Sequence, residues 1–162
     1  MLKLDLGSGF QKMDGFTTVD VCQTGVVDIL HDIETRLPFE DSSVDEIYSS
    51  HSLEHCKMSS VPIMLRDWNR VLKTGGKVYI IVPEFTNCLQ TFLNATEETR
   101  WDTPIEYIYG AQDNKTGQQL HKSGYTPVRL KKLLEESDFI IDTLDIINNG
   151  CADCIHLSAH KK

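Results

Sequence analysis

The stretch Leu4-Asp5-Leu6-Gly7-Ser8-Gly9 decides the fold, because it joins a short apolar strand, expected over residues 2–6, to a tight glycine turn. Glycines at a strand end let backbone amides approach a ligand with no Cβ in the way. A second strand, expected over residues 16–21, ends in the acid Asp20. A dinucleotide fingerprint would need a third glycine where Lys12 stands, and the Gly-Lys-Ser/Thr of a phosphate loop is absent. Both phosphate-binding interpretations therefore lose support.

Alternating strands and helices follow along the rest of the chain. Residues 26–30 and 44–49 are typical of strands, and the apolar, β-branched run 77–82 predicts a central strand covered on both faces. The strongest helix signal begins at Ser59-Ser60 and runs to Gly75-Gly76. The remaining predicted elements are a helix from Thr126-Pro127 and strands over residues 139–147 and 155–160, joined around Asn148-Asn149-Gly150. The alternation predicts an α/β fold with an open, mostly parallel seven-stranded sheet, an antiparallel last strand and helices on both faces.

Two segments depart from a regular α/β pattern. Only nine residues, 7–15, connect the first two strands, whereas a parallel crossover usually takes a dozen or more, so this crossover is expected to be reduced to a turn. Residues 84–125 are rich in Asn, Thr, Gln and Tyr, with helices expected near 87–95 and 104–111. Because open α/β sheets bind ligands beyond the carboxyl ends of their strands, this segment is predicted to cap a site.

The bulk composition excludes several classes of protein. The length of 162 residues fits one domain over residues 1–162. Residues 1–56 hold 11 acids and 3 bases and the rest 13 of each, so a nucleic-acid partner is disfavoured. No apolar run is long enough to span a bilayer, and Met1 leads directly into a strand rather than a signal peptide. We therefore expect a cytoplasmic protein with no membrane partner and with free thiols; the sequence does not indicate an oligomeric state.

Six motifs follow one another in order along the chain: Asp5-Leu6-Gly7-Ser8-Gly9, Val19-Asp20, His31-Asp32-Ile33 with Leu37-Pro38-Phe39, Ser43-Val44-Asp45, Ser50-His51-Ser52-Leu53-Glu54-His55 and Arg70-Val71-Leu72-Lys73-Thr74-Gly75-Gly76. Together they resemble the class I S-adenosylmethionine-dependent methyltransferases, in particular their small-molecule, methyltransferase-domain type 11-like branch. The resemblance implies a Rossmann-like sheet, S-adenosylmethionine as cofactor and S-adenosylhomocysteine as product. The amino-terminal helix that many relatives place over the substrate is expected to be missing here, with residues 84–125 in its role.

The same resemblance implies a set of cofactor contacts. They are Asp5, Gly7, Ser8, Gly9, Asp20, Asp32, Ile33 and Ser50. Asp20 would hold the ribose, since a carboxylate at a strand end can accept hydrogen bonds from both hydroxyls, and Asp32 with Ile33 would contact the adenine. Asp5 has a second reading, in which it orients the glycine turn without touching the ligand.

Catalysis would depend mainly on alignment. A sulfonium methyl is already electrophilic, and holding an acceptor in line with it can lower the barrier by roughly 7 to 11 kcal/mol. An oxygen acceptor would benefit from a base near neutral pH; His51 and His121 are the candidates, with Tyr109 shaping the pocket. A structural role in backbone hydrogen bonding stays open for both histidines. The tail patterns Tyr109-Gly110-Ala111-Gln112 and His121-Lys122-Ser123-Gly124-Tyr125 resemble a subgroup of the family.

A metal site is not expected. Cys151-Ala152-Asp153-Cys154 with His156 resembles half a zinc site, but a structural zinc ion takes four ligands and no second pair stands at suitable spacing. Reduced thiols at a hairpin are the simpler interpretation.

The leading function is therefore methyl transfer from S-adenosylmethionine to a small molecule, such as a sugar or another hydroxylated metabolite, because the polar cap favours a hydrogen-bonding acceptor. A non-catalytic S-adenosylmethionine-binding sensor or partner subunit is the alternative, since the first crossover is short. A nicotinamide-dependent oxidoreductase is disfavoured by Lys12.

Overall fold

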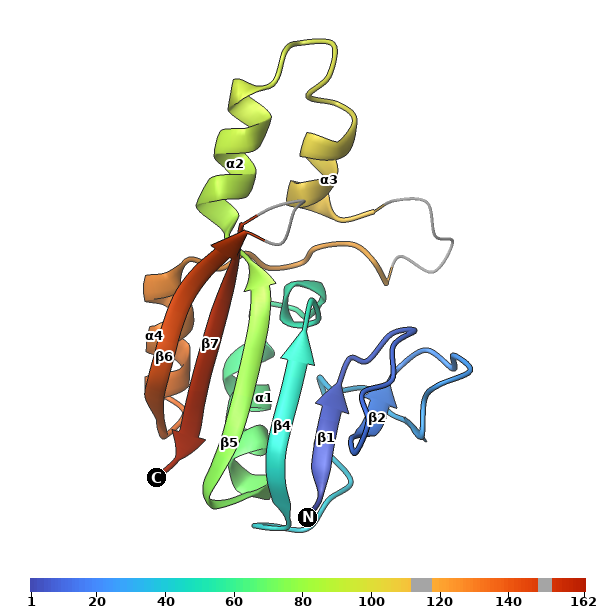
Figure 1. Cartoon of the computed structure of the whole chain (residues 1–162), viewed down its shortest axis with the longest axis vertical. Helices are drawn as coiled ribbons and strands as arrows, with labels where there is room; N and C mark the ends of the chain where they lie inside the picture. Colours follow the sequence, from blue (N-terminus) through green and yellow to red (C-terminus); the bar gives the residue numbers. More distant parts are fainter. Residues whose placement is uncertain (112–117, 149–152) are drawn as a thin grey trace.

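A seven-stranded sheet runs through the computed structural model, which describes residues 1–111, 118–148 and 153–162 (Figure 1). The strands are β1 (Lys3–Leu6), β2 (Thr17–Asp20), β3 (Ile29–Leu30), β4 (Val44–Ser50), β5 (Leu72–Pro83), β6 (Phe139–Asn148) and β7 (Asp153–Lys161). The helices are the 3₁₀ turn η1 (Leu53–His55) and the α-helices α1 (Val61–Val71), α2 (Phe85–Asn94), α3 (Thr103–Tyr109) and α4 (Pro127–Glu135).

The strand order is β3-β2-β1-β4-β5-β7-β6. Strands β1 to β5 are parallel, and β7 is antiparallel to both β5 and β6, as the sequence predicted for the last strand. The chain moves outward from β1 to β3 and then returns to the other side of β1 as β4. Such a reversal opens a crevice beyond the carboxyl ends of the two central strands, which is where open α/β sheets bind ligands. The mostly parallel α/β fold is confirmed.

The predicted end of the longest helix was wrong, and the third strand begins at Ile29 rather than at residue 26. Helix α1 ends at Val71, four residues before the glycine pair that was expected to stop it, and β5 begins at Leu72. Leu72 takes an extended backbone conformation and pairs with Val44 of β4. Its side chain is completely buried, so an apolar residue at helical spacing packs into the core as part of the sheet instead.

The crossovers from β1 to β2 and from β2 to β3 contain no helix, which confirms the reduced first crossover. Side-chain hydrogen bonds hold them instead: the Asp28 carboxylate lies 2.7 Å from Lys12 Nζ and 2.9 Å from Thr18 Oγ1. The Thr24 hydroxyl donates to the backbone carbonyl of Gly9 over 2.7 Å. The bond with Lys12 first, and those with Thr18 second, lower the pKa of Asp28 to about 2.

The prediction of helices on both faces holds for one face only. Helices α1 and α4 both lie behind the sheet in Figure 1, and α2 and α3 rise beyond its upper end. Among the described residues no helix covers the front face, because the two crossovers that would carry one are too short.

Strand β5 was predicted to be covered on both faces, and this was also wrong. Its side chains alternate, with Val78, Ile80 and Val82 fully buried, whereas Lys77 is exposed and Ile81 is half-buried. The front face carries polar groups suited to water.

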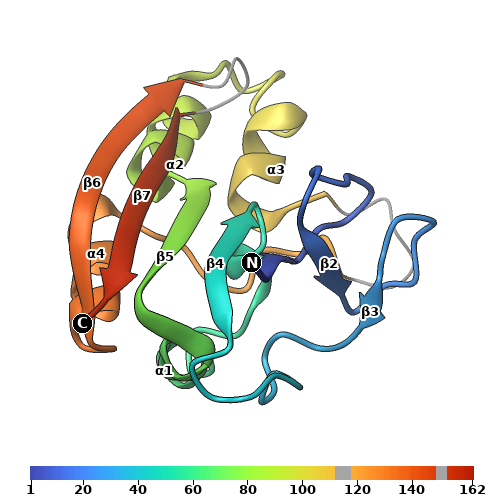
Figure 2. The same ribbon diagram turned by 60° about the horizontal axis from the view of Figure 1, so that its bottom comes forward.

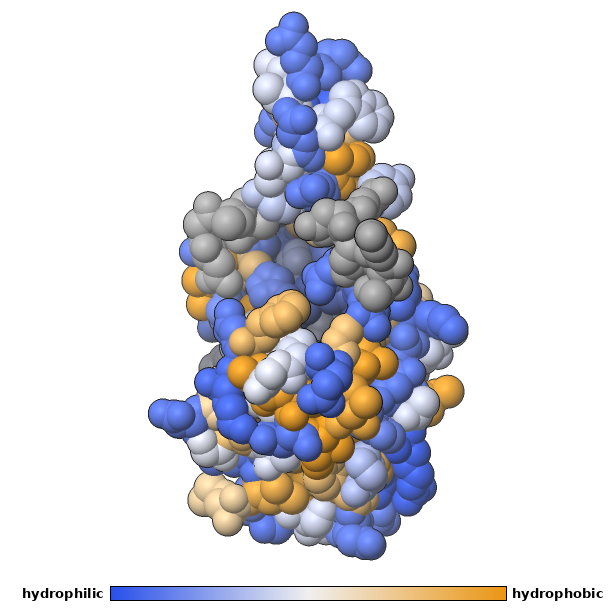
Figure 3. All heavy atoms as spheres, turned by 90° about the vertical axis from the view of Figure 1, so that its right-hand side faces the viewer, coloured by the Kyte–Doolittle hydropathy of each residue, from blue (hydrophilic) through white to orange (hydrophobic). Residues whose placement is uncertain are grey.

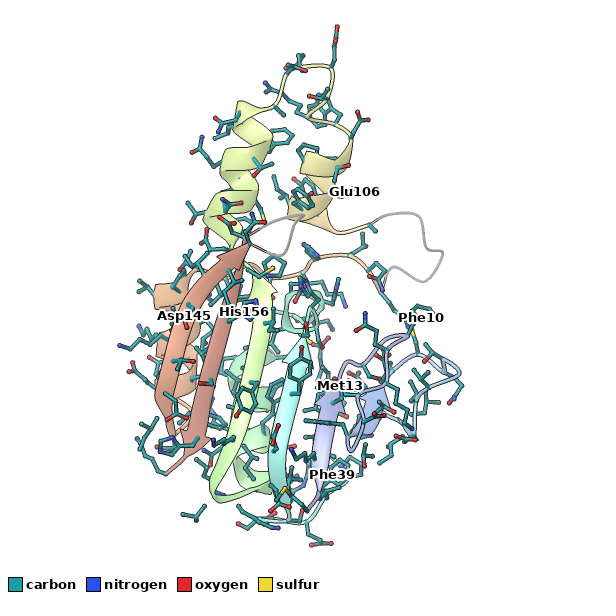
Figure 4. The ribbon with its side chains drawn as sticks, viewed as in Figure 1. Phe10, Met13, Phe39, Glu106, Asp145 and His156 are labelled. Carbon is teal, nitrogen blue, oxygen red and sulfur yellow. The ribbon has the colours of Figure 1, made fainter. Side chains whose placement is uncertain are left out.

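Asp145 and His156 illustrate that front face. The two residues pair in register between β6 and β7, and both are labelled in Figure 4. Elsewhere on the face, Lys3 of β1 and Glu46 of β4 form an ion pair at 2.9 Å. A sheet face of this kind resembles the solvated side of an antiparallel sheet.

The segment predicted to cap the site forms a two-helix projection. Helices α2 and α3 stand together beyond the carboxyl ends of β5 and β4, and the rings of Phe92 and Trp101 meet edge to face at 5.5 Å (Figures 1 and 2). The buried carboxylate of Glu84 caps α2 by accepting hydrogen bonds from the backbone amides of Thr86 and Asn87. In the described part of the chain, no helix is both long and apolar enough to cross a membrane.

Adjacent isoleucines on β5 test the one-sided burial of the sheet. Replacing the fully buried Ile80 with alanine should lower the free energy of unfolding by about 2 to 5 kcal/mol, because it leaves a cavity against the helical layer. Ile81→Ala, on the half-exposed front face, should cost less than half as much. Urea denaturation of both variants measures the difference, and equal losses would contradict the uncovered front face.

Candidate functional site

The glycine turn after β1 is fixed by close packing. Gly7 has φ +77°, a conformation that favours glycine, and its amide donates to the carbonyl of Val19 over 2.8 Å. A Cβ on Gly7 would lie only 2.0 Å from the hydroxyl oxygen of Ser52. Around Gly9, φ +59°, the corresponding space is open. The turn is therefore pressed against the segment after β4 on one side and accessible on the other.

Asp20 holds this turn in place. One carboxylate oxygen accepts a hydrogen bond from the amide of Gly9 and the other from the amide of Cys22, both over 2.8 Å. Each oxygen keeps a further lone pair. Asp32, which follows β3, is exposed and accepts a hydrogen bond from the amide of Glu34 over 2.9 Å. Both acids thus face a common hollow while they order their own loops.

That hollow is a pocket with a cavity volume of about 170 Å³. Six of the predicted residues line it: Gly7, Gly9, Asp20, Asp32, Ile33 and His51. Asp5, Ser8 and Ser50 do not belong to the lining, and the first two are buried beside it. Figure 3, which looks onto this edge of the molecule, shows a hollow in the surface beneath the projecting helices.

Sequence reasoning missed several lining residues. Phe10 is 82% exposed and follows the glycine turn directly, as Figure 4 shows. An aromatic residue directly after the glycine turn was a signal in the sequence that could have predicted this lining position. Gln118 and Gln119 also line the pocket, and the thiol of Cys22 hydrogen-bonds to the side chain of Gln118. These two come from a distant part of the chain, and no local pattern pointed to them.

A second pocket, with a cavity volume of about 400 Å³, adjoins the first. Its lining includes Glu54 and His55 of η1, Glu106 of α3, and His121. Three residues, His51, His55 and Gln119, line both pockets. The two cavities are therefore neighbours, and these three side chains stand at the border between them.

His51 carries a positive charge at neutral pH. Its Nε2 lies 3.8 Å from the sulfur of Cys154, and its Nδ1 lies 3.4 Å from a carboxylate oxygen of Glu54. The contact with Cys154 first, and that with Glu54 second, raise the pKa of His51 to about 10. A ring that is already protonated cannot serve as the general base expected from the sequence. Both of its ring nitrogens already face these two partners, so His51 places a positive charge at the border of the pockets.

His121 has the opposite electrostatics. Burial lowers the pKa of His121, so its ring is neutral near pH 7. The ring lies with its centroid 5.0 Å from that of His55 and lines the second pocket. Tyr109, in contrast, is 55% exposed and lies outside the lining of both pockets, whereas Tyr107 lines the second. The helical turn therefore aims Tyr107, two residues earlier, at the site.

The segment around His121 is held against η1 by its backbone. The amides of Lys122 and Ser123 both donate to the carbonyl of Glu54, over 2.7 and 3.1 Å. Gly110, with φ +77°, lets the chain pair there, since a Cβ would lie 1.9 Å from the carbonyl oxygen of Gln119. The two tail patterns thus meet in space, although Gln112 of the first lies outside the described residues.

The Cys-x-x-Cys pattern near the end of the chain lies only partly within the described residues, because Cys151 and Ala152 fall outside them. Cys154 is buried beside His51. His156 lies on the front face of the sheet, opposite Asp145.

Burial raises the pKa of Asp5 to about 6, and the charge of Asp20 adds to the effect. Because this is above the usual value of 3.8, the stability that Asp5 contributes is full below about pH 4 and is lost as the pH rises through about 6. Asp5→Asn, which mimics the neutral acid, should therefore raise the free energy of unfolding at pH 8 by up to about 3 kcal/mol, and with it the melting temperature. At pH 4 the substitution should change both quantities little. Thermal unfolding at both pH values checks this, with Asp14→Asn in the exposed loop as control. An equal gain at both pH values would contradict it.

The comparisons with known proteins agree with this geometry. Residues 4–80 match the family described as methyltransferase domain, and this range spans the strands from β1 into β5. A comparison with curated protein sequences found no match.

Solved structures share the fold over nearly the whole chain. An S-adenosylmethionine-dependent methyltransferase from Methanosarcina mazei aligns with a TM-score of 0.67 and 19% identity, over 98% of this chain and 91% of its own. The 1,6-didemethyltoxoflavin-N1-methyltransferase of Burkholderia thailandensis, solved with 1,6-didemethyltoxoflavin and S-adenosylhomocysteine bound, aligns with a TM-score of 0.69 and 16% identity, over 99% and 71%. A further S-adenosylmethionine-dependent methyltransferase, from Mesorhizobium loti, gives 0.68 and 14%, over 99% and 90%.

At these identities the structures establish the fold, and the family match adds the methyltransferase motifs of the first five strands. Those motifs include the glycine turn and the acids after β2 and β3 that line the first pocket. The methyltransferase-domain match over residues 4–80 and the shared fold together support an S-adenosylmethionine-dependent methyltransferase, that is, an enzyme with S-adenosylmethionine as its cofactor.

Proposed function

We propose that this enzyme transfers the methyl group to a small, polar molecule that binds in the second pocket. The observation that carries the proposal is the shared border: His51, His55 and Gln119 line both cavities. A methyl group leaving a cofactor in the first pocket would pass these side chains to reach an acceptor in the second.

The first pocket offers groups suited to each part of the cofactor. The carboxylate of Asp20 would accept hydrogen bonds from the ribose hydroxyls with its remaining lone pairs, and Asp32 with the buried Ile33 would contact the adenine. The open space around Gly9 would admit the methionine part close to the backbone. Asp5, Ser8 and Ser50 would support this arrangement from behind the turn. Asp5 would then orient the glycine turn without touching the ligand.

The second pocket favours a hydrogen-bonding acceptor. Glu54, Glu106, Gln119 and His121 give it charged and polar groups, and a volume of about 400 Å³ suits a small ligand. A sugar or another hydroxylated metabolite fits this chemistry. The neighbour from Burkholderia thailandensis, which binds a small molecule beside S-adenosylhomocysteine, supports an acceptor of this size.

The chain's own contribution to the chemistry would be positioning. When bound, S-adenosylmethionine supplies an electrophilic methyl group, so no activated nucleophile on the protein is required. His51 would attract a polar group of the acceptor through its positive charge, and the neutral ring of His121 would contact the acceptor from the opposite chain segment. Residues 84–125 would exclude water above them. Alignment of this kind accounts for roughly 7 to 11 kcal/mol of barrier lowering.

Removing the proposed ribose ligand should weaken cofactor binding. Asp20→Ala is expected to lower the affinity for S-adenosylhomocysteine about 10- to 100-fold, because hydrogen bonds to a charged group are worth about 1.5 to 3 kcal/mol. Isothermal titration calorimetry measures the change, with Asp14→Ala as a charge-matched control and thermal unfolding to confirm that each variant is folded. Since Asp20 also orders the turn, Asp32→Ala provides a second variant. Unchanged affinity in both would contradict the assignment.

The acceptor class is tested by transfer itself. Protein purified from cells should carry S-adenosylhomocysteine or S-adenosylmethionine, identified by mass spectrometry. With methyl-labelled S-adenosylmethionine, transfer should be seen to members of a panel of sugars and other hydroxylated metabolites, and not to nucleic acid or protein. Cofactor binding without transfer to any small molecule would count against the proposal and favour the binding-only alternative.

A further inference from the structure

Glu54 is a buried carboxylate whose one ion-pair partner among the described residues is His51. The residue is 2% exposed, and neither of its carboxylate oxygens accepts a hydrogen bond from the part of the chain that the structure describes. His51 comes within 3.4 Å of one oxygen, Oε1, and leaves Oε2 without a partner. A buried carboxylate in a protein is normally hydrogen-bonded at both oxygens or bound to a metal ion, and Oε2 of Glu54 has no such partner among the described residues.

The backbone fixes this carboxylate at the wall of the second pocket. Glu54 belongs to η1, and its carbonyl accepts hydrogen bonds from the amides of Lys122 and Ser123. The side chain lines the cavity together with His55 and His121. Two backbone hydrogen bonds therefore hold Glu54 where its carboxylate can meet a ligand in the cavity.

Two histidines flank Glu54 with one ring nitrogen each already engaged. Nδ1 of His55 lies 3.2 Å from the carbonyl oxygen of Leu120, and the ring of His121 hydrogen-bonds to the backbone of Tyr107. In metal sites, a hydrogen bond from one ring nitrogen to a backbone carbonyl orients the ring and leaves the other nitrogen for the ion. Both rings are held in this way.

One donor atom from each of Glu54, His55 and His121 lies within 4.8 Å of the other two. Ligands bound tetrahedrally at 2.0 to 2.2 Å lie about 3.4 Å apart, so side-chain movements of at most roughly 1.4 Å would complete the geometry. Two histidines and one carboxylate are a ligand set of catalytic zinc sites, in which a fourth position stays open.

We propose that Glu54, His55 and His121 bind a divalent metal ion of the zinc class, with an open coordination position directed into the second pocket. An oxygen of the acceptor would occupy that position, so this role rests on the proposed function. The metal ion would then be the means by which His121 contacts the acceptor. This assignment replaces the expectation, from ligand spacing along the sequence, that the chain holds no metal site.

Zinc binding to the full chain tests the proposal. After dialysis against a chelator and then buffer, the protein is titrated with ZnCl₂ by calorimetry, and one ion per chain is expected. Glu54→Gln and His121→Ala should each weaken binding at least 10-fold. The matched control is His160→Ala, because His160 pairs with Asp142 at 2.7 Å on the sheet, far from the pocket in sequence and structure. It should bind zinc with unchanged affinity.

Two further measurements make the outcome unambiguous. Cys154→Ser should bind zinc with unchanged affinity. If zinc binding is lost in Cys154→Ser but normal in Glu54→Gln, thiols hold the ion and the proposal is overturned. Co²⁺ in place of Zn²⁺ should give a visible spectrum that disappears in His121→Ala. Each variant is also titrated with S-adenosylhomocysteine. A wild-type chain that binds the nucleoside but no zinc would refute the metal site alone, whereas failure to bind either would refute the proposed function as well.

Discussion

The carboxylate of Asp20 holds together the two loops on which the site depends. It accepts hydrogen bonds from the amides of Gly9 and Cys22, and it thereby ties the turn after β1 to the turn after β2. Because β1 and β2 are parallel neighbours, their carboxyl ends lie side by side, and a single side chain can reach both loops. The same carboxylate lines the first pocket, so the group that orders the loops also faces the cavity.

In the part of the chain that the structure describes, helices cover one face of the sheet that carries this site. The short crossovers place no helix on the front face there, and polar side chains such as Lys77 and Glu46 lie on it. The binding edge does not require that face, since the pockets lie beyond the carboxyl ends of the strands. Helices α1 and α4 supply the buried contacts, and the hydrogen bonds of Asp28 fix the crossovers. Among the described residues, the long helices packed on the sheet thus lie on one face, and the two pockets lie at the carboxyl ends of the strands.

The second pocket depends on contacts between distant segments. Residues 121–123 pack against η1, which places His121 beside His55 although 65 residues separate them in the chain. The sequence shows a histidine at each position, but local motifs could not predict that the two rings would line one pocket together with a buried carboxylate. The electrostatics follow from the same packing. Contacts with Cys154 and Glu54 raise the pKa of His51, whereas burial lowers the pKa of His121.

The sequence by itself determined the mostly parallel α/β sheet with its antiparallel last strand, the glycine turn and the acids near the ends of β2 and β3, because these follow from local patterns of apolar residues, glycines and strand-end carboxylates. It also determined the short first crossover, since chain length alone rules out a helix between β1 and β2. Only the tertiary structure decided that Leu72 enters the sheet, that Tyr107 rather than Tyr109 lines the pocket, and that Glu54 is buried between two histidines. Each of these depends on packing between segments remote in sequence, which no local pattern encodes.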